Sequence, residues 1–98
     1  MKLSFSDLWE ECEKFYSSHK EEDSIEEILN KIQLKILLYK SISNNDKFSK
    51  EEKEKIISHT FGEILFELCK ISYIQNINVF TALQNNLNFK IVSYFENK

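Results

Sequence analysis

The sequence has 98 residues and contains no proline, no arginine and a single glycine, Gly62. All-β folds need glycine or proline at many of their tight turns, so this scarcity argues against them. It also excludes a glycine-rich loop that could cradle phosphates. Without arginine, the chain lacks the planar donor group that binds phosphate or guanine through two hydrogen bonds at once. These absences favour a helical domain.

Acidic residues outnumber basic ones, and the formal net charge is −3. This balance argues against a general nucleic-acid binder, which would carry a basic face. No apolar run reaches the roughly 20 residues that span a bilayer, and the start has no signal-peptide core. Cys12 and Cys69 lie on apolar helix faces without zinc-ligand spacing, as reduced core thiols do. We therefore predict a cytoplasmic protein without a membrane segment.

Apolar residues recur at helical spacing and predict four helices, at about 4–19, 24–42, 50–75 and 79–96. Ser24 with Glu27, and Ser49 with Glu52, have the spacing of capping boxes at two helix starts. Asn76 suits the left-handed end of the third helix. We therefore expect one all-α domain over residues 1–98.

The second predicted helix is apolar on more than one side. Such a helix is either central in its fold or shared with a partner chain. The four apolar stripes are formed by Phe5, Leu8, Trp9, Cys12, Phe15 and Tyr16; by Ile25, Ile28, Leu29, Ile32, Ile36 and Tyr39; by Ile57, Phe61, Ile64, Leu68 and Ile71; and by Phe80, Leu83, Leu87, Ile91 and Tyr94.

The last third of the chain carries a family likeness. Residues 59–66 read His-Thr-Phe-Gly-Glu-Ile-Leu-Phe, residues 77–83 read Ile-Asn-Val-Phe-Thr-Ala-Leu, and Asn88-Phe89-Lys90 follows. This pattern resembles the third and fourth helices of the MazG-type all-α nucleoside triphosphate pyrophosphohydrolases. The likeness covers residues 24–95 in helix order and length, and residues 62–66 and 82–83 in detail. It implies a four-helix MazG-like bundle completed by dimerisation or tetramerisation.

The resemblance also implies a chemistry. These enzymes cleave a nucleoside triphosphate to a monophosphate and pyrophosphate, with Mg²⁺ held by Glu-x-x-Glu on the second helix and Glu-x-x-Asp on the third. Residues i and i+3 share one helix face. Mg²⁺ prefers carboxylate and phosphate oxygens, and the bound ion can orient the attacking water.

The family's acidic positions map unevenly onto this sequence. Glu63 retains the second acid of the third helix, whereas Thr60 replaces the first. On the second helix, Lys35 and Leu38 occupy the Glu-x-x-Glu positions. An earlier register would use Glu27 and Asn30 instead. If Lys35 points at Glu63, a salt bridge stands where the family holds its metal.

From this mapping, Glu63 is the candidate catalytic residue. The candidate metal ligands are Glu63, Glu67 and Glu27, and the candidate phosphate contacts are Lys35 and Lys90. An ordinary alternative is that Glu63, Glu67 and His59 form a solvated row on one helix face.

Three functions follow as hypotheses. The first is a MazG-like protein with weakened or lost hydrolysis that serves as a homo-oligomeric binding, regulatory or assembly module, with a nucleotide as a candidate ligand. The second is an active, Mg²⁺-dependent pyrophosphohydrolase whose acids are rearranged around Glu63. The third is a helical protein–protein interaction module whose likeness to the family reflects only shared periodicity.

Overall fold

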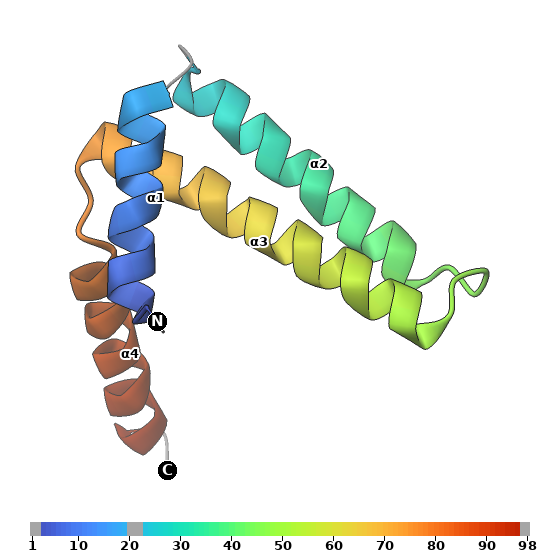
Figure 1. Cartoon of the computed structure of the whole chain (residues 1–98). Helices are drawn as coiled ribbons and strands as arrows, with labels where there is room; N and C mark the ends of the chain where they lie inside the picture. The colour runs from blue at the N-terminus through green and yellow to red at the C-terminus, as the bar shows by residue number, and fades with distance from the viewer. Residues whose placement is uncertain (1–2, 20–22, 97–98) are drawn as a thin grey trace.

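The structure is a computed structural model that describes residues 3–19 and 23–96 (Figure 1). Within those ranges the chain forms helices α1 (Phe5–His19), α2 (Ile25–Ser43), α3 (Lys50–Gln75) and α4 (Val79–Glu96), and no strand. The all-α prediction is confirmed, and each helix begins and ends within one residue of its predicted bounds.

Side-chain caps explain where the helices begin. The Ser24 hydroxyl accepts a hydrogen bond from the backbone N–H of Glu27 at 3.1 Å. At the start of α3 the capping box is complete, because Ser49 and Glu52 each accept a hydrogen bond from the other's backbone N–H at 3.1 Å. Such a cap stabilises a helix by about 1 kcal/mol.

Helices α2 and α3 form a long antiparallel pair, and α1 lies across the C-terminal half of α3 (Figure 1). Ile28 and Ile32 of α2 and Thr60 of α3 are buried. At the α1–α3 contact, the buried Cys69 thiol lies 3.9 Å from the backbone oxygen of Trp9. Burial, helped by the nearby Cys12, raises the pKa of the Cys69 thiol to about 12.

Helix α4 leaves this body and projects away from it (Figure 1). The preceding turn contains Asn76 in the left-handed conformation, with φ 52° and ψ 48°. The Asn78 side chain then accepts a hydrogen bond from the backbone N–H of Thr81 at 3.0 Å and begins α4. The Phe80 ring lies 6.2 Å from the Phe5 ring, edge to face. No residue of α4 is buried, and beyond this contact of Phe80 the residues Leu83, Leu87, Ile91 and Tyr94 of the predicted stripe are exposed.

The core of the chain is small. In α3 the buried residues are Thr60, Glu67, Cys69 and Ser72, whereas Phe61 and Leu68 of the predicted stripe are exposed. Ile57, Ile64 and Ile71 of the same stripe are half-buried, so the described chain covers the apolar side of α3 only in part. Across the described residues, no helix is both long and apolar enough to cross a membrane.

Candidate functional site

Lys35 and Glu63 face each other across the α2–α3 pair. The ammonium Nζ of Lys35 lies 2.5 Å from Oε2 of Glu63. One turn earlier on α3, Nε2 of His59 lies 3.2 Å from the other carboxylate oxygen of Glu63. Both oxygens of the candidate catalytic carboxylate are therefore engaged by side chains of this chain.

The ion pair perturbs the acidity of Glu63. The hydrogen bond from Lys35 lowers the pKa of the Glu63 carboxyl below its ordinary value, and the charges of Lys35 and His59 act in the same direction. Partial desolvation of the carboxyl opposes this effect. The side chains of Lys35 and Glu63 are 25% and 38% exposed, so solvent and salt reach both groups.

Acid should weaken this contact between α2 and α3. Because the folded-state pKa of Glu63 lies below its ordinary 4.5, the stabilising contribution is present above that value and is lost as the pH falls through the lowered pKa. We expect the melting temperature of the wild type to fall more steeply below about pH 5 than that of Glu63→Gln. Lys35→Met should lose the same part of the pH dependence. Parallel pH profiles for all three proteins would contradict the contact.

The other mapped positions offer no metal ligand that is free to bind. Thr60 is buried, and its hydroxyl donates to the backbone oxygen of Ile56 at 2.8 Å. Leu38 is an exposed hydrocarbon side chain. The mapped face of α2 and α3 therefore presents one carboxylate, an ammonium, a satisfied hydroxyl and a leucine, whereas Mg²⁺ requires several oxygen ligands.

The three candidate metal ligands, Glu63, Glu67 and Glu27, do not lie together. Oε1 of Glu67 accepts a hydrogen bond from Lys70 at 3.1 Å, and Glu67 is buried. Glu27 is exposed in the first turn of α2. Across residues 3–19 and 23–96, no group of three His, Cys, Asp or Glu side chains is placed to hold a metal ion.

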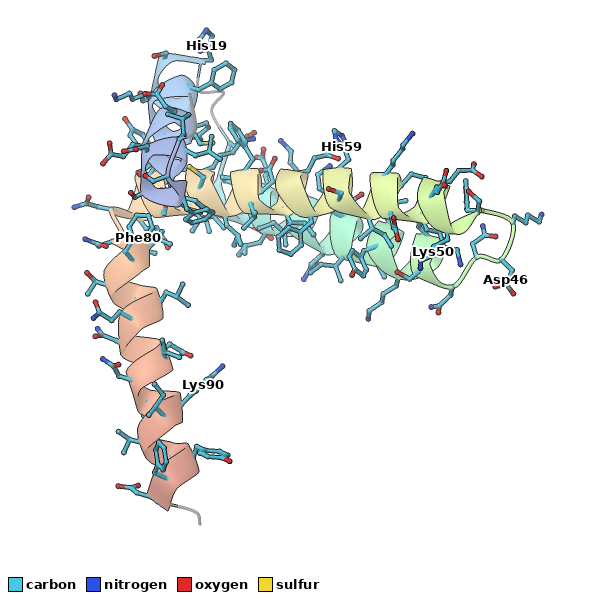
Figure 2. All side chains as sticks on the ribbon, turned by 60° about the horizontal axis from the view of Figure 1, so that its bottom comes forward. His19, Asp46, Lys50, His59, Phe80 and Lys90 are labelled. Carbon is cyan, nitrogen blue, oxygen red and sulfur yellow. The ribbon has the colours of Figure 1, made fainter. Side chains whose placement is uncertain are left out.

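The two candidate phosphate contacts are also separate. Figure 2 shows Lys90 on the part of α4 that projects from the body, well beyond Phe80. Lys35 lies between α2 and α3 and is paired with Glu63. A phosphate group would therefore need different partners at the two lysines.

A partly buried ionic cluster, absent from the sequence-based predictions, lies where α1, the start of α2 and α3 meet. Lys70 Nζ lies 3.1 Å from Glu67 Oε1 and 3.6 Å from Asp23 Oδ2, and Lys31 Nζ lies 3.4 Å from the same Asp23 oxygen. The Lys70 ammonium is also 5.7 Å from the ring centre of Tyr16.

This cluster has chemical consequences for its members. Burial raises the pKa of the Tyr16 hydroxyl, and the charge of Asp23 adds to the effect. Glu67 Oε2 is buried and finds no hydrogen-bond donor among the described residues. The i, i+3 spacing of Glu67 and Lys70 is visible in the sequence, but the arrival of Asp23 from the preceding loop is not.

Searches of family models, of curated proteins and of solved structures found no match.

Proposed function

We propose that this chain is a MazG-like domain whose hydrolytic chemistry is weakened or lost, and that it serves as a binding, regulatory or assembly module. The observation that supports this proposal is the Lys35–Glu63 ion pair. Lys35 occupies one of the positions at which the resembling enzymes use a metal-binding carboxylate. In this chain the positive charge beside Glu63 comes from a side chain.

Electrostatics explains why the pair disfavours Mg²⁺. An ammonium about 4 Å from a divalent ion is repelled by several kcal/mol at an effective dielectric constant near 20. Mg²⁺ also demands nearly octahedral oxygen coordination. Binding at Glu63 would have to displace both Lys35 and His59, and it would regain few other ligands on this face.

The proposal includes self-association. Helical spacing puts Leu29 and Ile36 of α2 on the same side of the antiparallel pair as Phe61 and Leu68 of α3, and all four are exposed. Two copies that pack these sides together would form one four-helix bundle with a shared apolar core. We refer to this side of the pair as the α2–α3 face.

An interaction module unrelated to the MazG family is the second candidate. The observation that favours it is the number of large apolar side chains left exposed on α2 and α4. Apolar surface of this extent marks sites of protein association in general. The same exposed surface is also expected under the first proposal. The position of Lys35 opposite Glu63 is the observation that favours the first proposal over the second.

Pyrophosphate release tests the proposed loss of hydrolysis. Wild type, Glu63→Gln and the matched exposed variant Glu54→Gln would each be given a panel of common and modified nucleoside triphosphates with Mg²⁺ or Mn²⁺. Because an ammonium rather than a second carboxylate faces Glu63, we expect no metal-dependent release above the protein-free control from any of them.

Two outcomes would oppose this expectation. Release by wild type and Glu54→Gln that disappears in Glu63→Gln would establish an active enzyme anchored on Glu63. Equal release by all three would place hydrolysis at another site, and would equally end the proposal that the domain has lost it.

A further inference from the structure

Helix α4 has the composition of a buried helix but lies in solvent. Of its 18 residues only Lys90 and Glu96 are charged. Its apolar side chains occupy two sides of the helix, and none of its residues is buried. Leu83 is 66% exposed and Phe89 is 72% exposed. An ordinary surface helix buries one apolar stripe and shows a charged face to water, which α4 does not.

The turn before α4 fixes the direction in which the helix leaves the body. The backbone N–H of Ile77 donates to the oxygen of Ser72 at 2.9 Å, and Asn76 adopts a left-handed conformation. These bonds end α3, and Asn78 caps the next helix. Beyond Phe80, α4 extends away from the other three helices (Figure 2). Covering α4 with its own chain would require this turn to be remade.

The single chain exposes more surface to solvent than a compact monomer of its mass would. Its accessible area is 8046 Å², whereas a compact monomer of 11.7 kDa would expose about 5,900 Å². Its radius of gyration is 16.6 Å, whereas about 13 Å is typical of a compact domain of this length. The excess of about 2,100 Å² is spread over all four helices, α4 among them, and is of the size that each partner buries in an obligate homodimer, roughly 1,000–2,500 Å².

We propose that α4 is an arm that buries its predicted apolar stripe, the side of Leu83, Leu87 and Ile91, on a second copy of this chain. The interface lies outside the α2–α3 face, because α4 projects from one end of that pair (Figure 1). The inference goes beyond the proposed function, since an α4 interface would exist whether or not the domain hydrolyses nucleotides.

Charge and symmetry favour a second copy as the occupant. Two copies with a net charge of −3 repel each other, and α4 is a nearly uncharged surface on which they can meet. The outer side of α2 exposes a further apolar group, formed by Leu34, Leu37 and Leu38. In a two-fold assembly every such surface occurs twice, so the copies can cover one another without leaving an open end.

The test compares two charge substitutions on the same helix. Leu87→Lys places an ammonium on the side of Leu83 and Ile91, whereas Asn86→Lys places it on the side of Ala82 and Ser93. Light scattering after size exclusion should give at least twice 11.7 kDa for wild type and for Asn86→Lys. For Leu87→Lys we expect the dissociation constant to rise at least 100-fold. Equal masses for all three proteins, or a monomeric wild type at high micromolar concentration, would overturn the proposal.

A second measurement does not depend on the lysine variants folding. A photo-crosslinking phenylalanine analogue at position 87 of the full chain should give a covalent species of twice the chain mass, and the same analogue at position 86 should give little. No crosslink from position 87 would overturn the proposal. Wild-type binding to phosphatidylcholine–phosphatidylglycerol vesicles that Leu87→Lys abolishes would also overturn it, in favour of a lipid surface.

The α2–α3 bundle is tested separately with Phe61→Lys. A lower assembly mass by light scattering in this variant, together with continued crosslinking from position 87 at high protein concentration, would show that both interfaces exist. If Phe61→Lys lowers the assembly mass and Leu87→Lys does not, the α2–α3 face is the interface, and the proposal for α4 is overturned. Neither result bears on pyrophosphate release, so the failure of one proposal does not decide the other.

Discussion

Replacing Lys70 with methionine is expected to lower the free energy of unfolding by about 3 kcal/mol. The Lys70 side chain is 14% exposed and lies against two carboxylates, those of Glu67 and Asp23, whose side chains are 10% and 9% exposed. Methionine preserves much of the volume but leaves both carboxylates with fewer positive partners. An uncompensated buried charge is costly because the lost attraction is not replaced by water. Urea denaturation followed by circular dichroism would measure the change at a fixed protomer concentration.

The control for Lys70→Met is a lysine in an exposed pair. Lys14 lies 3.5 Å from Glu11 at the surface of α1, so Lys14→Met should change stability by less than about 0.5 kcal/mol. The double variant Lys70→Met/Glu67→Leu should recover much of the loss, because Asp23 retains Lys31 and Glu67 no longer brings a charge. Equal losses for Lys70→Met and Lys14→Met would contradict the buried cluster.

Replacing Lys35 with glutamate is expected to make the stability of the domain depend on divalent metal. The substitution sets a second carboxylate opposite Glu63, so repulsion should lower the melting temperature in the absence of metal. A metal present at about 100 times its dissociation constant would restore about 2.7 kcal/mol. For a domain of this size that corresponds to a rise of about 10–20 °C.

Thermal melts with and without Mn²⁺ or Mg²⁺ would measure this response. Wild type and Lys35→Gln serve as controls, because the first retains the ammonium and the second removes it without adding an acid. Neither should respond to metal. A metal-independent melt of Lys35→Glu would mean that positions 35 and 63 do not share the geometry of a metal site.

Local signals in the sequence predicted the helices closely, because helix ends depend on neighbouring residues. The serine caps at positions 24 and 49 and the left-handed Asn76 act within a few residues of their partners. The Lys35–Glu63 contact joins residues 28 positions apart on two helices. Periodicity gives the face of each helix but not the partner that this face meets, so the residues alone leave this contact as one possibility among several.

The sequence predicted burial less well than it predicted helices. Periodicity identifies the apolar side of α3, but it does not say whether that side meets α1, α2 or another chain. Phe61 belongs to this apolar side and is nevertheless exposed in the single chain. The charged Glu67, in contrast, is buried and is paired with Lys70. The stripe of α4 is equally visible in the sequence, yet among the described residues no member of it is buried.

The pairing of Lys35 with Glu63 also bears on the surroundings in which the domain works. A metal ion leaves its site when the medium is depleted of it, whereas a lysine side chain is attached to the backbone and stays at the same local concentration. The contact between α2 and α3 should therefore be indifferent to chelators and to the identity of the divalent ions present. It should respond instead to ionic strength, since both side chains are partly open to solvent.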